Sequence, residues 1–444
     1  SSSGYFRDVQ KKVAGFVESG QLGIFAKAYW GHPEYRLPPE ANLMAVAHYL
    51  DALVWQREVV KLHAIFGGKN PHPNFLVGGA PCAISIDPNN PPKGGGQRGG
   101  DAGTALNITG LQTVQHAIRQ MREFVDQVYV PDTLAIAGFY KDWFKQGEGV
   151  GNFMTLGEFP ARGMADPSGY MIPPGVILDR DLSKIHPIDL DAENEIQEFV
   201  SHAWYRYSVG KDKGLHPYRG ETALDYTGPK PPYQHLNVEE DYSWLKSPRW
   251  RGMPVEVGPL ARVLMLYASG HAQTHELVYK TLAHLDLPIA ALYSTLGRTA
   301  ARTLETKLIA DAMQGWYDEL VANIRAGDLS TANASMWEPS SWPARAQGVG
   351  VMEAPRGALS HWIVIENQKI ANYQAIVPST WNAGPRDAAG NQGPYEAALA
   401  GHRLHDAKQP IEILRTIHSF DPCIACAVHV AGPDGNELTR IRVV

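Results

Sequence analysis

Two cysteines near the C-terminus form the strongest candidate metal site in the sequence. Cys423 and Cys426 are separated by two residues, and His429 follows three positions after the second thiol. A turn of this spacing brings both sulfurs to one side, where they can hold one metal ion with an imidazole close by. Spacing alone leaves two other interpretations open, namely a redox-active dithiol and a pair of ordinary buried thiols.

Two further cysteine chemistries fit the sequence less well. Covalent haem attachment needs a histidine directly after the second cysteine, where Ala427 stands. A zinc knuckle needs a full set of ligands, and the third cysteine, Cys82, lies after a Gly-Gly-Ala-Pro segment without a partner nearby. Three cysteines also exclude a scaffold built on disulfides.

Two upstream segments carry polar residues that would suit a metal with small anionic ligands. Arg356 stands between a proline and a glycine, on an expected turn between two strands, and Ser379 follows a second expected strand. Guanidinium and hydroxyl groups donate hydrogen bonds to such ligands. Taken alone, the Arg356 segment is more typical of a surface turn whose arginine forms a salt bridge.

Composition and charge narrow the class of protein. The chain has 444 residues, 44% of them hydrophobic, with Lys+Arg 40 against Asp+Glu 46 and a net charge of −6. A dedicated nucleic-acid-binding protein normally carries a basic excess, so no nucleic-acid partner is expected. No apolar run approaches the roughly 20 residues of a membrane-spanning helix. The composition indicates a globular chain of enzyme size with a large core.

Hydrophobic periodicity predicts the elements that position these residues. Apolar residues recur at helical spacing over residues 5–23, 40–66, 111–128, 258–283 and 295–325, and a short helix is expected near 192–206. The region 150–250 is rich in Gly, Pro, Trp and Tyr and is expected to form an irregular covering layer. Strand patterns take over from about residue 349 and end in a hairpin within 428–443. The expected fold class is α+β and predominantly helical, a long helix bundle with small β-sheets near the C-terminus. Residues 1–444 are expected to form a single large domain.

The motif Asp421-Pro422-Cys423-x-x-Cys426-x-x-His429 is highly specific, and through it the sequence resembles the large subunit of nickel–iron hydrogenases. Shorter segments along nearly the whole chain agree with the motif: Ser19–Gly23, Tyr29–Gly31, Pro38–Glu40, Tyr242–Pro248, Glu256–Leu260, Ala354–Gly357 and Val377–Asn382. The segment Gly67–Pro73 is most similar to the membrane-associated uptake enzymes of the family.

This resemblance implies a Ni–Fe(CN)2(CO) centre and assigns roles to four residues. Cys423 matches a terminal nickel thiolate, and Cys426 matches a thiolate that bridges nickel and iron. Arg356 matches an arginine above the open metal position, and Asp421 matches the carboxylate that pairs with it. Soft thiolates suit these metals. We expect both thiols to be buried and to lie close to Arg356.

The resemblance also implies roles around the centre and at a second metal. Pro355 and Ser379 match positions beside the cyanides, and Leu359 matches an apolar position beside the carbon monoxide. His429 and the backbone carbonyl of Ala375 match ligands of a buried Mg. The implied reaction is the reversible heterolytic oxidation of H2 to protons and electrons.

The implied partners follow from the electron path. The chain has no spare cysteines for iron–sulfur clusters, so an iron–sulfur small subunit must accept the electrons. The resemblance further implies a membrane cytochrome b reached through the small subunit. It also implies export with that subunit to the periplasmic side of the cell membrane.

The sequence departs from the family pattern at both ends. It has no Arg-x-Cys-Gly-x-Cys motif, which supplies the second thiolate pair, so we expect a fragment that lacks the N-terminal part and is incomplete as an enzyme. Residues 430–444 follow the histidine at which mature members end. We expect them to be a tail that a maturation endopeptidase removes.

Two alternatives come from other functional classes. A cluster-less structural relative of the large subunit would have no use for the two thiols together with His429 and Arg356. A zinc-binding maturation or scaffold protein would leave Arg356 and Ser379 unexplained. An active hydrogenase is therefore the preferred interpretation.

Overall fold

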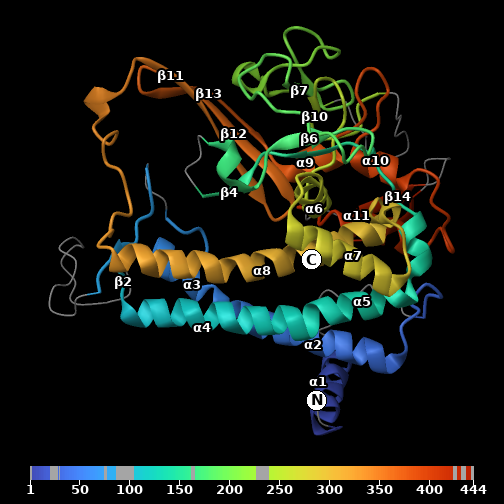
Figure 1. Cartoon of the computed structure of the whole chain (residues 1–444). Coiled ribbons are helices and arrows are strands. Elements are labelled where there is room, and N and C mark those ends of the chain that lie inside the picture. The colour runs from blue at the N-terminus through green and yellow to red at the C-terminus, as the bar shows by residue number, and fades with distance from the viewer. Residues whose placement is uncertain are drawn as a thin grey trace. The chain divides into compact units, whose positions relative to one another are not determined.

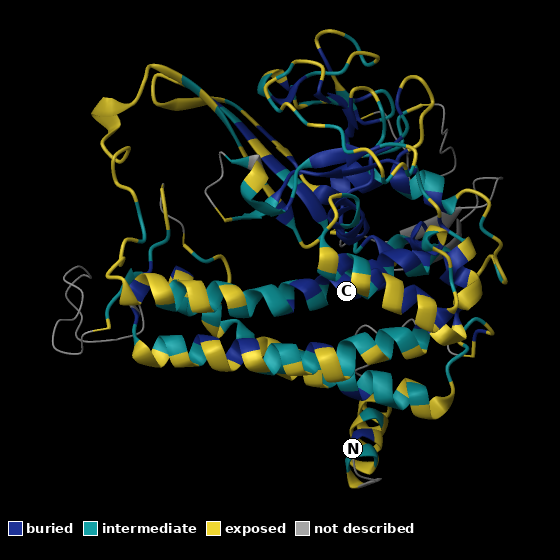
Figure 2. Cartoon of the chain, in the orientation of Figure 1, coloured by how far each residue is buried: buried dark blue, intermediate teal, exposed yellow. Residues whose placement is uncertain are grey.

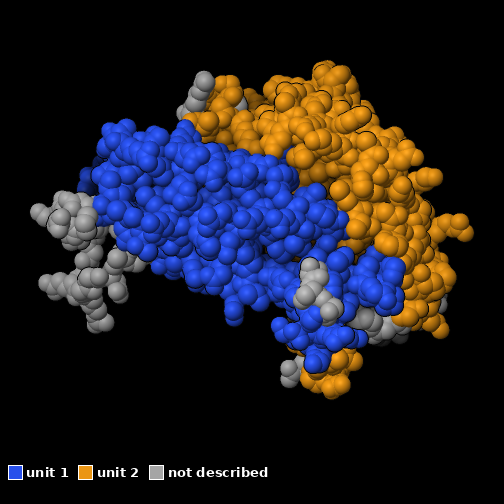
Figure 3. Space-filling view, turned by 60° about the horizontal axis from the view of Figure 1, so that its bottom comes forward, with its two compact units in different colours: residues 1–12, 37–133, 306–343 blue, residues 13–36, 134–305, 344–444 orange. Residues whose placement is uncertain are grey.

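The computed structural model describes residues 3–20, 29, 31–74, 78–86, 105–161, 166–226, 240–423, 428–431 and 437–441. Helices predominate and the sheets are small, which confirms the predicted fold class (Figure 1). Two compact units are distinguished by colour in Figure 3. Unit 1 comprises residues 1–12, 37–133 and 306–343, and unit 2 comprises residues 13–36, 134–305 and 344–444. The single-domain arrangement stays a prediction.

Unit 1 is built mainly from helices. These are the first part of α1 (Ser3–Ser19), α2 (Pro39–Val59), α3 (Lys61–Gly67), α4 (Ile108–Phe124), the π-helical turn Val125–Tyr129 and residues 306–325 of α8 (Thr295–Arg325). The short strands β1 (Ala83–Ile84) and β2 (Ala105–Leu106) pair in parallel. Trp55 of α2 stacks on Phe124 of α4, and Arg122 of α4 forms an ion pair with Asp311 of α8 at 3.4 Å. Side-chain stacking and charge therefore join the helices of this unit.

The helix predictions for unit 1 are confirmed, with different ends. The segment predicted at 40–66 is interrupted at Val60, so it forms α2 and α3. The segment predicted at 111–128 starts earlier because the side chain of Asn107 accepts a hydrogen bond from the Gly110 N–H at 2.8 Å. Beyond Tyr129 the chain continues as α5 (Val130–Phe139).

Two large apolar cores are described in unit 2, and the first is built around α6 (Pro259–Ala268). The first core packs α6 against α7 (Ala272–Leu285), the start of α8 and Phe153 of β3 (Phe153–Thr155). Every residue of α6 from Pro259 to Leu266 is buried, which Figure 2 shows in dark blue. The second core contains Trp250, Trp362 and Trp381. The break between α6 and α7 falls at Gly270, whose φ of 81° ends the first helix.

The region 150–250 contains small two-stranded sheets. Their strands are β3, β4 (Glu158–Pro160), β5 (Tyr170–Ile172), β6 (Gly175–Ile177), β7 (Ile196–Phe199), β8 (Tyr205–Arg206), β9 (Ala223–Leu224) and β10 (Ser247–Trp250). The helix expected near 192–206 is wrong. Burial alternates with a period of two from Ile196 to Phe199, so the segment forms β7 and pairs antiparallel with β10.

A three-stranded antiparallel sheet follows, in the order β11-β12-β13. The strands are β11 (Arg345–Ala354), β12 (Gly357–Glu366) and β13 (Lys369–Ile376). They lead into α9 (Pro378–Ala383), α10 (Pro394–Leu399) and α11 (Ile411–Ser419). The predicted C-terminal hairpin is confirmed as β14 (Val428–Ala431) paired with β15 (Glu437–Ile441). Short 3-10 helices lie at Lys141–Lys145, Pro167–Gly169, Pro217–Arg219, Ile289–Leu292 and Pro339–Ser341.

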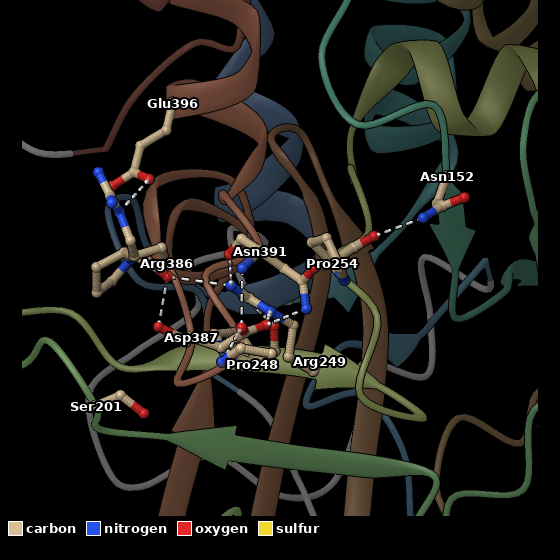
Figure 4. A network of polar contacts seen from close by, with 12 residues as sticks. Asn152, Ser201, Pro248, Arg249, Pro254, Arg386, Asp387, Asn391 and Glu396 are labelled. Carbon is tan, nitrogen blue, oxygen red and sulfur yellow. Dashed lines mark hydrogen bonds and ion pairs between the residues drawn. The ribbon is translucent and has the colours of Figure 1, made fainter. Parts of the chain in front are cut away.

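A buried arginine organises the loop that follows α9. Arg249 of β10 is fully buried, and its Nε lies 2.9 Å from Oδ2 of Asp387 (Figure 4). Its Nη2 donates to the carbonyls of Pro385 and Asn391, each at 3.1 Å. A charged side chain in a core needs such a complete set of partners.

Within the described ranges, no helix combines the length and apolar character needed to cross a membrane.

Candidate metal centre

The Arg356 segment is the tight end of a β-hairpin, as predicted. Ala354 of β11 pairs with Gly357 of β12, so Pro355 and Arg356 alone form the loop. Gly357 has a φ of 131°, and a Cβ there would lie 2.6 Å from the backbone nitrogen of Gly258. The hairpin end therefore packs backbone against backbone on the residue that precedes α6.

Arg356 forms an ion pair with Asp421. Nη2 of Arg356 lies 3.3 Å from Oδ1 of Asp421, and the two side chains are 36% and 42% exposed. Nε of Arg356 is buried and has no hydrogen-bond partner among the residues that the structure describes. The guanidinium therefore keeps an unused donor beside its carboxylate partner.

Asp421 and Cys423 follow the end of α11. Asp421 has a φ of 54°, and its N–H donates to the carbonyl of His418 at 2.9 Å. Two residues later, the N–H of Cys423 donates to Oγ of Ser379 at 3.1 Å. Ser379 lies in the first turn of α9 and is 5% exposed. The cysteine segment thus contacts both the Arg356 hairpin and α9.

Contacts connect four of the predicted site residues, Arg356, Asp421, Ser379 and Cys423. Leu359 lies in β12 opposite Met352, and Ala375 lies in β13 opposite His361. Cys426 lies outside the described residues, and for His429 the structure gives the backbone, which pairs with Arg440 in the β14–β15 hairpin. Among the described side chains, no group of three or more His, Cys, Asp and Glu residues could hold a metal.

The expectation that Cys423 is buried is wrong for this chain. Cys423 is exposed and forms no disulfide. The residue follows Pro422 in an irregular segment beyond α11, so it lies at the surface of unit 2 rather than in its core. Ser379, whose Oγ accepts the hydrogen bond from the Cys423 N–H, is buried.

A half-buried tyrosine lies next to the cysteine segment. The ring of Tyr395 lies 4.7 Å from that of Phe420, which directly precedes Asp421. Burial raises the pKa of Tyr395, and the negative charge of Asp421 raises it further. Phe420 also contacts the guanidinium of Arg298, at 4.0 Å from the ring centre. Arg298 in turn pairs with Glu256 at 2.7 Å, with both side chains 2% exposed.

Sequence reasoning missed the charged residues behind the Arg356 hairpin. Arg262 of α6, Glu305 of α8 and Glu353 of β11 form a buried cluster. One signal was available, since Arg262 is the sole charged residue in the apolar run of α6. Burial raises the pKa of Glu353 from 4.5 to about 7, against the opposing effect of the Arg262 charge.

Comparison with known proteins identifies the family. The family model of nickel-dependent hydrogenases matches residues 1–429. The uptake hydrogenase large subunit of Rhizobium leguminosarum bv. viciae is 50% identical over 452 residues, which cover 100% of this chain and 74% of that protein. The hydrogenase-1 large chain of Escherichia coli K12 is 48% identical, with the same coverage of both chains.

Solved structures agree with the sequence relatives. A [NiFeSe] hydrogenase variant from Desulfovibrio vulgaris Hildenborough matches with a TM-score of 0.69 at 30% identity, over 88% of this chain and 72% of that one. The Ni-Fe-Se hydrogenase of Desulfomicrobium baculatum matches with a TM-score of 0.67 at 30% identity, over 87% and 71%. The chain therefore belongs to the nickel-dependent hydrogenase family, as a large subunit.

Proposed function

We propose that Arg356, Asp421, Ser379 and Cys423 form this chain's side of a Ni–Fe(CN)2(CO) site that oxidises H2 reversibly to protons and electrons. One observation carries the proposal. The three consecutive residues Asp421 to Cys423 contact Arg356 at 3.3 Å and Ser379 at 3.1 Å, so elements far apart in sequence converge on one thiol segment.

The donor groups present fit such a centre. The buried Nε of Arg356 has no partner among the described residues, as expected for a donor directed to an absent ligand. Ser379 Oγ accepts a hydrogen bond from Cys423, and its own O–H can donate to an anionic ligand. A cysteine thiolate is a ligand that nickel and iron favour. We assign Pro355 and Leu359, at the end of the hairpin and in β12, to the lining of the same site.

The residues of this chain would each have a distinct task in the reaction. When bound, the centre supplies the Lewis acidity and the redox change that splitting H2 requires. Cys423 and Cys426 would hold it through their sulfurs. Arg356 stays positively charged, so it would stabilise negative charge near the centre, while Asp421 fixes the direction of its guanidinium.

A Cys423→Ser substitution in the assembled enzyme tests this proposal. Serine keeps the size and the backbone N–H but replaces a soft thiolate by a hydroxyl, so nickel content and H2-dependent dye reduction should both be lost. Cys82→Ser is the matched control, because Cys82 is buried in unit 1 and burial raises its pKa. The control should keep its nickel. Full nickel loading and turnover in Cys423→Ser would refute the site.

We further propose a Mg site that uses the backbone carbonyl of Ala375 and the side chain of His429. Ala375 itself is exposed in β13, beside the buried Gln374. Gln374 is 9% exposed and accepts a hydrogen bond from Nζ of Lys246 at 3.1 Å, and Lys246 lies 3.7 Å from Glu198. The chemical support for the assignment is the ligand type, since backbone carbonyl oxygens are ligands that hard cations such as Mg accept. Metal analysis of His429→Ala should show one Mg fewer per enzyme with the fold retained.

The partners that we propose follow from the need for an electron acceptor, because this chain has no spare cysteines to bind iron–sulfur clusters. A hydrogenase large subunit works with a small subunit, and we infer that the small subunit here carries the iron–sulfur clusters. We place the enzyme at the periplasmic side of the cell membrane, with a cytochrome b as the next electron carrier. Solubilised membranes should yield a complex of all three when the small subunit is tagged. Recovery of all the enzyme from the cytoplasm would contradict this placement.

We also propose that a maturation endopeptidase removes residues 430–444. The hairpin supports this proposal, because β14 commits the backbone of His429 to pairing with Arg440. The family match also ends at residue 429. Intact-mass measurement of the active enzyme should give a large subunit that ends at His429, and an active, nickel-loaded protein that retains Val444 would refute it.

A further inference from the structure

A buried arginine holds the backbone directly before Arg356. Arg262 is 3% exposed and donates from Nη1 to the carbonyl of Ala354 at 2.8 Å and from Nη2 to the carbonyl of Pro355 at 2.9 Å. These two carbonyls belong to the end of the hairpin that carries Arg356. One planar guanidinium therefore fixes two consecutive peptide groups, which a single-point donor could not do.

Two carboxylates hold the arginine in place from separate elements. Nε and Nη2 of Arg262 bind both carboxylate oxygens of Glu305, the second at 2.9 Å, in a bidentate pair. Nη1 binds Oε2 of Glu353 at 3.1 Å. Glu305 comes from α8, and Glu353 is the next-to-last residue of the strand β11, just before the hairpin end. Arg262 thus has all its donors engaged and little freedom to reorient.

Glu353 is itself anchored to the core. Its Oε1 accepts from the N–H of Leu156 at 2.7 Å, and its own N–H donates to Oε2 of Glu158 at 2.6 Å. The end of β11 is therefore connected both to Arg262 and to the strand region 153–160. The hairpin end cannot shift along the sheet without breaking these bonds.

Backbone packing fixes the same turn from its other side. A Cβ on Gly258, which has a φ of 127°, would lie 2.9 Å from the carbonyl oxygen of Arg356. Gly258 precedes Pro259, the first residue of α6, and Arg262 lies one helical turn further along. The start of α6 thus contacts the carbonyls of Ala354, Pro355 and Arg356.

We propose that Arg262 is a positioning residue for Arg356, and that it acts with Glu305 and Glu353 to set the direction of the Arg356 guanidinium toward Asp421. This inference rests on the proposed function of Arg356. Arg262 differs from two other buried arginines in the backbone carbonyls to which it donates hydrogen bonds. Arg249, held by Asp387, binds the carbonyls of the 385–391 loop, and Arg298, held by Glu256, binds that of Gly147.

A double-mutant cycle in the assembled enzyme tests the proposal. Arg262→Lys keeps the charge but loses the planar fork, so H2 oxidation should fall at least about tenfold, since small misplacements of catalytic groups are costly. In the Arg356→Lys background the same change should lower turnover less than about twofold, because the residue being positioned is already gone. Nickel content should stay at the wild-type level in each variant.

The control is the same substitution at another buried arginine. Arg249→Lys should change turnover by an equal factor with and without Arg356→Lys, because its partners lie in a different loop. Hydrogen–deuterium exchange gives a readout that does not depend on activity. The amides of 356–358 should exchange faster in Arg262→Lys and at the wild-type rate in Arg249→Lys.

The outcomes separate this inference from the proposed function. If Arg356→Lys leaves turnover unchanged, the role of Arg356 itself fails. If Arg356→Lys lowers turnover but Arg262→Lys lowers it by the same factor with and without Arg356→Lys, Arg262 has only a structural role and the inference fails. Should Arg262→Lys not assemble, Glu305→Gln takes its place in the cycle, because it keeps the arginine and removes one charge. Unchanged exchange at 356–358 in that variant would also overturn the proposal.

Discussion

Arg356 and Asp421 form an ion pair of 3.3 Å between residues that both occupy chain reversals. Arg356 lies in the two-residue end of the β11–β12 hairpin, and Asp421 has a left-handed φ of 54° just beyond α11. The pair therefore connects the hairpin to the segment that carries Cys423.

Arg356→Lys should assemble with its metals and lose most of its turnover. Lysine keeps the positive charge but presents a single ammonium in place of a planar fork, so it cannot serve Asp421 and a ligand of the centre together. We expect H2 oxidation to fall by about a hundredfold, the usual cost of losing a preorganised donor. Dye-linked H2 oxidation and nickel analysis of the same sample measure both effects.

The control for this substitution lies in the same sheet. Arg345 begins β11, pairs with Glu366 at 3.3 Å and has a side chain 70% exposed. Arg345→Lys should leave turnover within about twofold of the wild type, because exposed ion pairs contribute little. A comparable loss in both variants would mean that the hairpin is sensitive to any arginine change.

Asp421→Asn should lower turnover with little effect on stability. Asparagine tolerates the left-handed backbone at this position, so the substitution removes the charge without straining the chain. Losing an ion pair of about 1 kcal/mol corresponds to roughly a fivefold lower rate. The melting temperature should move little because both side chains are more than one-third exposed. An unchanged rate would show that Arg356 is oriented without its carboxylate.

Ser379→Ala should loosen the cysteine segment. The substitution leaves the N–H of Cys423 without its acceptor at 3.1 Å, at a cost of about 1 kcal/mol in unfolding free energy. Ser360→Ala is the control, since Ser360 is equally buried but accepts from the indole of Trp362. Hydrogen–deuterium exchange at residues 421–423 should rise in the first variant and not in the second. Ser379→Thr keeps the hydroxyl group, so exchange at residues 421–423 should proceed at the wild-type rate in that variant.

Glu353→Gln should change how stability depends on pH. Burial raises the pKa of Glu353 from 4.5 to about 7, so the folded protein binds this proton more tightly than the unfolded chain does. The stability that the carboxyl group contributes is therefore complete below pH 4.5 and is lost as pH rises through about 7. The unfolding free energy of the wild type minus that of the variant should fall by about 3 kcal/mol across this interval.

Urea unfolding at several pH values measures this difference. Glu366→Gln, an exposed position at the end of β12, should give a difference that does not fall over the same interval. A flat difference for Glu353→Gln as well would mean that the ion pair with Arg262 fully compensates for burial of the carboxylate.

The elements that carry the site were largely predictable from the sequence. The hairpin end at Arg356 follows from Pro355 and Gly357 between two strand patterns, and α8 was predicted over its full range 295–325. The strand β7 was not predicted, because alternating burial over four residues is too short to stand out against a helical pattern. The arrangement around Arg262 was also missed, since its partners Glu305 and Glu353 are distant in sequence and their pairing depends on the tertiary fold.

The surface position of Cys423 marks another limit of sequence reasoning. The motif predicts which residues are ligands, but their burial depends on every segment that packs over them. The role of Cys423 as a metal ligand stays a prediction, and the exposure that the motif implied is wrong for this chain.

Contact between Gly258 and Gly357 has a consequence for how mutational scans of this enzyme should be interpreted. Both residues have φ values near 130°, and a methyl group on either would collide with the opposing backbone. Alanine at either position should abolish activity as completely as a change at Arg356. A screen that records turnover alone would therefore rank two residues without any functional group among the reactive ones, and measuring protein abundance in parallel would separate steric exclusion from chemistry.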